Sequence, residues 1–405
     1  MIGERIRQAR LLAGLTLEEV AREMGAHGQS ITRAGLSKYE TNKSVPKPAF
    51  LLLLARILNV KSSYFWDQTS ITVEWIAFRK HAQLPVKDQD QIKAQAVRHA
   101  ESYIWLQSIL NKAERPNFMK TQHLKNMTEV ENLAEKVRKS WKLDVLPIDN
   151  MIQTIEDQGG IVATTRAMGV KFDGLAGWIN NKFPLIVSNA AISNDRFRYN
   201  LAHELGHILI QNSTQSNETE SYAHRFAAAF LVPAKRAFEE LGSKRRTLSF
   251  GELRLLKRKY GMSMQAWVRR ALDLGIIDLA EYKRQCIAFS SAGIKKAEPD
   301  DHPVSEEPQK LKLMTLRALA EGMITKEKAE ALCPECINEL ENEGLGRSMR
   351  RDIAKSPLEM LKLPKKERDK LLFAAAKKAE KEYIGNSALI SFDAFGEDDL
   401  HDETR

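Results

Sequence analysis

The 405-residue chain contains only three cysteines, Cys286, Cys333 and Cys336. So few cysteines exclude a disulfide framework and favour a reducing compartment. The longest apolar run, residues 49–55, is far too short to cross a bilayer. The N-terminus also lacks a basic segment followed by an apolar leader. We therefore expect a cytoplasmic protein without a membrane segment.

Charge is abundant and unevenly distributed. Charged residues make up 28% of the chain and the formal net charge is +9. Residues 1–66 hold ten Lys/Arg against five Asp/Glu, which is more than half of the net excess. A basic N-terminal domain is typical of proteins that bind an anionic partner such as DNA, although a basic surface alone does not establish it.

The length predicts several domains, and apolar spacing predicts a mainly α, multidomain fold. A five-helix N-terminal domain is followed by an α+β domain with a small sheet and then by a helical C-terminal region. The predicted boundaries are a helix-turn-helix domain at 1–66, a helical linker at 67–126, an α+β domain at 127–285, a second linker at 286–310, a helical segment at 311–345, and a helix with an acidic tail at 346–405.

The first domain has the pattern of a DNA-reading module. Residues 16–25 predict a supporting helix that ends in glycine, and residues 32–40 predict a second helix. In such a module the N-terminal side chains of the second helix reach the major groove. Leu36 and Tyr39 face inward. The candidate DNA contacts are Thr32, Arg33, Ala34, Ser37, Lys38 and Lys43.

This region resembles the Cro/repressor-like (XRE) helix-turn-helix family over about residues 4–66. The resemblance implies operator DNA as a partner and a homodimer. Two features depart from the family pattern: Leu17 stands where many members carry a phosphate-contacting glutamine, and residues 26–30 form an insertion in the turn. The alternative is a small helical bundle with a basic face that touches no DNA.

The middle of the chain changes from helix to strand and back. Residues 67–115 predict a long helix that carries Trp75 and Phe78, and a second helix at 128–141 would be capped by Thr128 and Glu131. Short strands are predicted, with a hairpin turn at Asn180 and Asn181 joining the last two. The predicted strands are 160–165, 174–179 and 183–187, and the helices after them are 195–210, 219–230 and 250–274.

The helix at 195–210 contains His203-Glu-Leu-Gly-His207. Two histidines four residues apart share one helix face and can bind one metal ion. Glu204, next to the first histidine, can take a proton from water and pass it to a leaving amine. Both histidines could instead be packed core residues.

Residues 130–235 resemble the ImmA/IrrE metallopeptidases, on residues 134–143 with Pro147-Ile148, residues 197–207, and residues 220–233. The resemblance implies a zincin-like endopeptidase domain in which His203, His207 and Glu220 bind Zn²⁺ and Glu204 is the general base. Glu218 is a rival ligand. His224 stands where asparagine is common, and we interpret it as a hydrogen-bond support for Glu220 rather than a fourth ligand.

Two weaker signals lie near the C-terminus. Cys333 and Cys336 have metal-knuckle spacing without a second pair, so we interpret them as helix-terminus cysteines rather than a zinc or redox site. Residues 365–383 predict an amphipathic helix before a tail with six acids and one arginine. The tail is similar to the toxin-binding tails of small antitoxins, with a solvated disordered terminus as the alternative. Its candidate partner contacts are Phe392, Phe395, Asp398 and Asp399.

The order of these parts predicts a DNA-binding regulator, antitoxin-like, that carries a zinc-dependent endopeptidase. The peptidase would cleave its own chain or a partner repressor, and the tail would mask a toxin, for example a nuclease. One alternative is a non-catalytic repressor that uses the peptidase fold as a scaffold to bind a toxin. Another is a stress-response protease that its DNA-binding domain merely localises.

Overall fold

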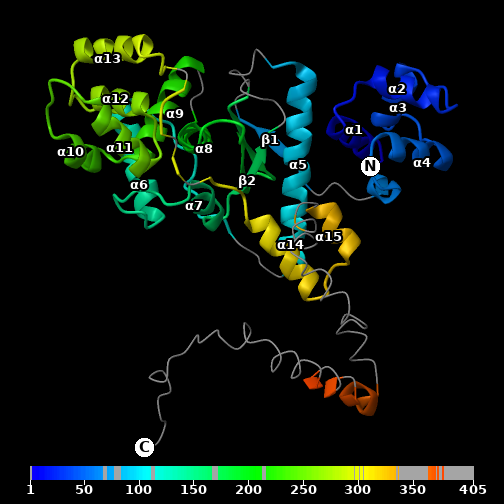
Figure 1. Ribbon diagram of the computed structural model, residues 1–405. Coiled ribbons are helices and arrows are strands. Elements are labelled where there is room, and N and C mark those ends of the chain that lie inside the picture. Colours follow the sequence, from blue (N-terminus) through cyan, green and yellow to red (C-terminus); the bar gives the residue numbers. More distant parts are fainter. Residues whose placement is uncertain are drawn as a thin grey trace, which may run out of the picture. The chain divides into compact units, whose positions relative to one another are not determined.

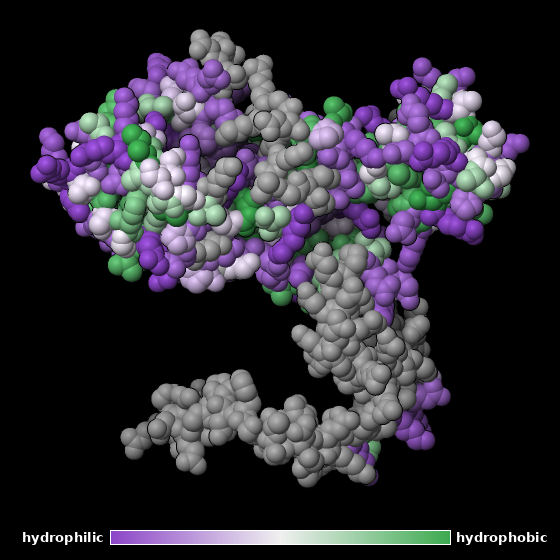
Figure 2. All heavy atoms as spheres, turned by 45° about the horizontal axis from the view of Figure 1, so that its top comes forward, coloured by the Kyte–Doolittle hydropathy of each residue, from purple (hydrophilic) through white to green (hydrophobic). Residues whose placement is uncertain are grey.

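The computed structural model describes most of the chain, which divides into two compact units at residues 1–314 and 315–405. Among the described residues helices predominate, as predicted. None of the described helices has the length and apolar composition of a membrane span. On the face shown in Figure 2, hydrophilic residues cover most of the described surface. The described residues are 2–66, 71–76, 84–110, 115–166, 172–211, 216–295, 297–300, 302–303, 305–333, 336, 364–370, 372–373 and 376–377.

The N-terminal domain consists of five short helices with a core of their own. Figure 1 shows α1 to α4 grouped together. Each apolar stripe of the sequence is buried in this core, so the predicted helices are confirmed within one or two residues. Its buried side chains include Ile6, Val20, Leu36, Leu54 and Phe65. The helices are α1 (Ile2–Leu12), α2 (Leu17–Ala26), α3 (Arg33–Glu40), α4 (Pro48–Ile57) and the 3-10 turn η1 (Ser62–Trp66).

The connection to the second domain differs from the predicted continuous helix. Val73–Trp75 forms a strand, β1, and only Val86–Ile109 forms the helix α5. β1 is extended because its backbone pairs with a strand more than one hundred residues away, a tertiary contact that outweighs local helical spacing. Phe78 lies outside the described residues.

The second domain has a mixed sheet in the order β1-β3-β4-β2. The strands β2 (Ile161–Thr165), β3 (Gly174–Ile179) and β4 (Phe183–Asn189) confirm the three predicted ones. β3 and β4 are antiparallel, β2 is parallel to β4, and β1 is antiparallel to β3. Asn180 and Asn181 both have positive φ, at 50° and 54°, which is the geometry of the predicted tight hairpin turn.

Helices cover this sheet and extend the domain. The core contains buried side chains of β2, β3 and β4. It also contains side chains from helices that precede these strands in the sequence and from helices that follow them. Figure 1 shows α8 and α9 together beside the sheet, and α8 packs on β3 and β4. The helices are α6 (Met127–Ser140), α7 (Met151–Asp157), α8 (Asn194–Leu209), α9 (Ser216–Leu231), α10 (Ala234–Leu241), α11 (Phe250–Tyr260), α12 (Met264–Asp273) and α13 (Leu279–Ser291).

The capping prediction for α6 is wrong. Its N-cap is Asn126, whose side chain accepts a hydrogen bond from Glu129 N at 2.9 Å, so the helix begins one residue before Thr128. Glu131, which we placed in the capping box, instead binds Arg225 and Arg270. Two cationic partners outweigh a cap for this carboxylate.

Residues 286–310, predicted as a linker, are not a free tether. They begin in the last turns of α13, Glu306 is buried in the second domain, and the Glu298 side chain is only 5% exposed. Glu298 accepts hydrogen bonds from Met264 N and Gln265 N at the start of α12. Glu306 forms a buried ion pair with Arg198 of α8. The acidic residues that suggested a linker therefore place their carboxylates at helix N-termini and against an arginine.

The second unit begins within α14 (Lys310–Ala320) and includes α15 (Lys326–Leu332). Cys333 is the C-cap of α15, which agrees with the interpretation of a helix-terminus cysteine, and a disulfide that the sequence did not indicate joins it to Cys336. Spacing of three brings their Cα atoms to 5.6 Å, within disulfide range. Of the predicted helix at 365–383, residues 365–370, 372–373 and 376–377 are described and helical. Phe392, Phe395, Asp398 and Asp399 lie outside the described residues.

Candidate metal centre and DNA-binding surface

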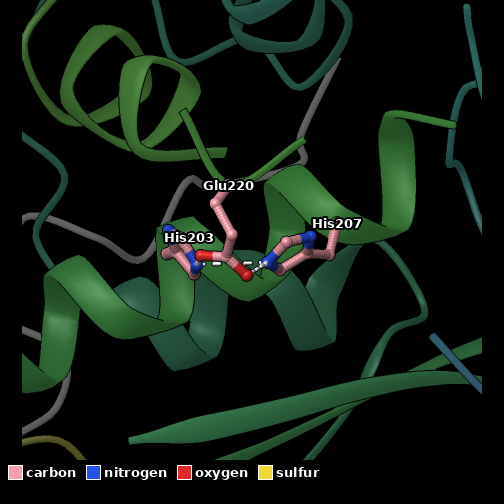
Figure 3. Close-up of side chains that lie close together, drawn as sticks. All are labelled: His203, His207 and Glu220. Atoms are coloured by element: carbon pink, nitrogen blue, oxygen red, sulfur yellow. Dashed lines mark hydrogen bonds and ion pairs between the residues drawn. The ribbon is translucent and has the colours of Figure 1, made fainter. Parts of the chain in front are cut away.

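Three side chains from two helices converge on one point (Figure 3). His203 and His207 project from α8, and Glu220 reaches between them from α9. The Nε2 atoms of the histidines are 3.1 Å apart. The Glu220 carboxylate oxygens lie 3.4 Å from His203 Nε2 and 3.5 Å from His207 Nε2. Both histidines are buried, whereas the Glu220 side chain is 27% exposed.

This donor set fits a zinc ion. Two imidazole nitrogens and one carboxylate are the three protein ligands of one type of catalytic zinc site, which leaves a fourth position open. The three ligand atoms lie within 4.8 Å of one another. They approach from two packed helices, α8 and α9, so the packing of these helices sets the spacing of the three ligand atoms.

Glu204 lies between the two histidines in the sequence, and its side chain is buried. Its carboxyl group lies against the first residue of β3. A Cβ built on Gly174 would stand 2.8 Å from both Cγ and Oε1 of Glu204. A glycine at this strand position therefore provides the space that the Glu204 carboxylate occupies. Sequence reasoning named Glu204 but missed Gly174, since a strand glycine alone does not reveal what faces it.

The helix that carries the histidines is fixed along its length. Near its start, Arg196 and Asn200 donate hydrogen bonds to Asp173, just before β3. Near its end, a Cβ on Gly206 would lie 3.2 Å from Ala223 Cα, so this glycine allows α8 and α9 to pack closely. The spacing of Glu220 from the histidines depends on that close contact.

A buried arginine also holds α8. The Arg198 guanidinium binds the Glu306 carboxylate and donates to the carbonyl oxygens of Ile148 and Asp149. The Arg198 and Glu306 side chains are each 1% exposed. Glu306 also accepts from Met151 N at 2.7 Å and Ile152 N at 3.0 Å, at the start of α7. Sequence reasoning missed this pair because its members are 108 residues apart.

The helix that carries Glu220 is held by an ionic cluster. Arg225 of α9 binds Glu131 of α6 and Asp273 of α12, and Arg270 of α12 binds Glu131. These contacts fix α9 between two neighbouring helices. The rival ligand Glu218 is exposed, and its carboxylate accepts a hydrogen bond from the Tyr222 hydroxyl at 3.2 Å.

His224 lies beside the metal centre. Its ring centroid is 4.3 Å from that of His203, and its Nδ1 is 3.4 Å from the Tyr199 hydroxyl. Burial raises the pKa of the Tyr199 hydroxyl, which therefore stays protonated and donates to His224 O at 3.1 Å. The position of His224 against His203 suits a role in orienting that imidazole.

The candidate DNA contacts lie on α3 or next to it: Thr32 is its N-cap and Lys43 follows its C-terminus. Thr32 caps α3 by accepting from Gly35 N at 3.1 Å. Ser37 is half-buried, and Arg33 forms an exposed ion pair with Glu18. Glu40 has a different function: it accepts two hydrogen bonds from Arg10 and ties α3 to α1. The exposed candidates are Thr32, Arg33, Ala34, Lys38 and Lys43.

The first domain is thus a small helical bundle in which α3 is capped and carries exposed side chains. The second is an α+β domain with a His-His-Glu centre. Residues 6–65 match the helix-turn-helix family, and residues 157–272 match the IrrE N-terminal-like domain of the M78 peptidases. The chain therefore combines a helix-turn-helix DNA-binding domain with an IrrE-like peptidase domain. The second match starts after the lead-in residues 134–148 and extends beyond the predicted 235. No curated protein matches the chain.

Proposed function

We propose that the protein is a transcriptional regulator whose IrrE-like domain is a zinc-dependent endopeptidase. The observation that carries the proposal is the meeting of the His203 and His207 Nε2 atoms with the Glu220 carboxylate, beside the buried Glu204. His203, His207 and Glu220 would hold the ion. A bound zinc ion supplies Lewis acidity that polarises the scissile carbonyl.

The chain's own residues provide the proton transfers. The Glu204 carboxylate accepts a proton from the attacking water and returns it to the amine nitrogen of the departing product. The side chain is buried, which removes competing solvent from the carboxylate. Gly174 sets the position of this carboxylate from the other side. The His224 ring restricts the orientation of His203, and thereby the direction of its Nε2.

The helix-turn-helix domain would bind operator DNA through α3, as a homodimer. Thr32, Arg33, Ala34, Ser37, Lys38 and Lys43 supply contacts to phosphates and base edges. The acidic tail would bind a toxin through Phe392, Phe395, Asp398 and Asp399. Cleavage of this chain or of a partner repressor would then release the operator.

The test compares wild-type protein with Glu204→Gln and with Glu218→Gln, a matched change on an exposed glutamate of the facing helix. Metal content is measured by elemental analysis after zinc loading. Each protein is then incubated with an epitope-tagged Glu204→Gln copy of the full chain, and fragments are detected by intact mass. We expect about one zinc per chain in all three proteins, and cleavage of the tagged copy by all but Glu204→Gln.

Two results would decide against the proposal. Zinc-loaded wild-type protein that cuts neither the tagged copy nor candidate repressors from neighbouring genes would favour the non-catalytic scaffold. Equal cutting by Glu204→Gln would remove Glu204 from the chemistry. Cleavage of a separate repressor by a chain that binds no toxin would favour a protease that its DNA-binding domain localises.

A further inference from the structure

The strand β1 pairs with β3 in a specific register. Val73, Glu74 and Trp75 lie opposite Ile179, Trp178 and Gly177 in antiparallel pairing. Hydrogen bonds extend the pairing at both ends: Ile76 N donates to Ala176 O at 2.9 Å, and Asn180 N donates to Thr72 O at 2.8 Å. β1 thus occupies the side of β3 opposite β4, which is the edge of the sheet formed by β2, β3 and β4.

That edge runs to the candidate active site. β3 begins at Gly174, where an added Cβ would meet the Glu204 carboxylate, and α8 packs against β3. β1 reaches Ile76, which lies opposite Ala176, only two residues along β3 from Gly174. A peptide that adds to a sheet edge binds through its main chain, so its backbone can be recognised in many sequences. A substrate on this edge would therefore be directed toward Glu204.

The lack of a side chain at Gly177 allows a neighbouring backbone to approach closely at this edge. A Cβ at Gly177 would stand 2.8 Å from Glu74 O and 3.1 Å from Trp75 Cε3. Glycine inside a strand weakens it and often marks a place where another backbone approaches closely. The neighbour here is β1 itself.

We propose that β1 occupies, in cis, the outer edge of β3, so that an extended peptide can dock there only after β1 has left it. Naming that peptide as substrate rests on the proposed peptidase function. Because β1 lies between η1 of the DNA-binding domain and α5, its release would change the segment that connects the DNA-binding domain to the peptidase. Peptide binding and the state of that connection are therefore linked through one strand.

The alternating geometry of β1 provides a matched pair of variants. Thr72 and Ile76 direct their backbone hydrogen bonds toward β3, so Glu74 does as well, and Val73 directs its N–H away. Glu74→Pro removes a bond to β3 at an exposed side chain, whereas Val73→Pro removes an outward N–H. Gly177→Ala is a second way to displace β1, because the added methyl group meets Glu74 O.

Binding is measured with the full chain that carries Glu204→Gln, so that the protein does not cleave the probe during the measurement. The probe is a fluorescein-labelled peptide that copies residues 71–76 with one lysine added at each end. Its binding is measured by fluorescence anisotropy. We expect Glu74→Pro to tighten binding about tenfold or more, since apparent affinity scales with the fraction of open sites. Val73→Pro should bind the probe like the parent. Hydrogen exchange of residues 174–182 should rise with Glu74→Pro, and that of residues 71–76 with Gly177→Ala.

If Glu74→Pro increases exchange but the probe does not bind, β1 only protects a sheet edge and the proposal is overturned. Unchanged exchange and binding in both Glu74→Pro and Gly177→Ala would also overturn it. Probe binding by Glu74→Pro without any cleavage by the Glu204-containing protein would support the docking edge and contradict the peptidase function. The two proposals can therefore fail separately.

Discussion

Gly174 and Glu204 form a complementary pair: the glycine that opens β3 leaves the space that the glutamate side chain of α8 fills. A Cβ on Gly174 would be 2.8 Å from Glu204 Oε1, a distance that requires the carboxylate to move. In this structure the sheet therefore sets the position of the proposed general base as much as the helix that carries it.

Gly174→Ala should lower peptidase activity by about tenfold or more, because a general base displaced by a fraction of an ångström loses its alignment. Zinc binding should persist, since the three heavy atoms nearest to the added methyl group all belong to Glu204 and not to a ligand. The measurement is cleavage rate alongside metal content. Gly251→Ala, on α11 where an added Cβ meets nothing within 4 Å, is the control. Full activity in Gly174→Ala would contradict this positioning.

Glu220→Ala should weaken zinc binding by more than about 100-fold, a larger loss than is usual for residues that only support a ligand. Glu218→Ala should change zinc affinity little, because its carboxylate is exposed and bonded to Tyr222. Competition with a fluorescent zinc chelator measures both. A larger loss in Glu218→Ala than in Glu220→Ala would reverse the choice between them.

The sequence was most informative where local pattern and chemistry coincide. The helix periods of the N-terminal domain, the Asn180-Asn181 turn and the placement of His203 and His207 on one helix face were predicted correctly, because each depends on residues near one another in the chain. β1 was predicted as helix and Glu306 as part of a linker, because their partners, β3 and Arg198, are distant in sequence. Nothing local to Gly174 or Glu131 indicates their partners either. Long-range pairing was thus beyond a reading of local periodicity.

Glu306→Ala should destabilise the peptidase domain by about 3–5 kcal/mol, because it leaves the buried Arg198 charge without its partner. It also removes the acceptor for two N–H groups at the start of α7. Glu307→Ala is the matched control: its ion pair with Arg166 is exposed and contributes at most about 1 kcal/mol. Urea unfolding followed by circular dichroism compares them. Equal midpoints would show that the buried pair does not hold α8.

Glu156→Gln should stabilise the protein at pH 8. Burial raises the pKa of the Glu156 carboxyl from 4.5 to about 7. As pH rises from 4.5 to 7 the unfolded chain loses this proton before the folded chain does, so wild-type stability falls by on the order of 3 kcal/mol. The glutamine variant lacks this loss, and the two proteins should converge near pH 4. Parallel stability profiles from pH 4 to 8 would contradict the raised pKa.

Lys38→Ala should weaken DNA binding by about tenfold and reduce the salt dependence by about one counterion, if the exposed Lys38 on α3 contacts a phosphate. Arg56→Ala removes an exposed positive charge from the same domain, but on α4, and should have a smaller effect. The probe is a DNA fragment from immediately upstream of the gene, with a shuffled fragment of equal composition for comparison. Affinity is measured at several salt concentrations, so that general charge loss is separated from a contact of α3. Equal losses of affinity for Lys38→Ala and Arg56→Ala would show that net charge, and not a contact made by α3, governs binding.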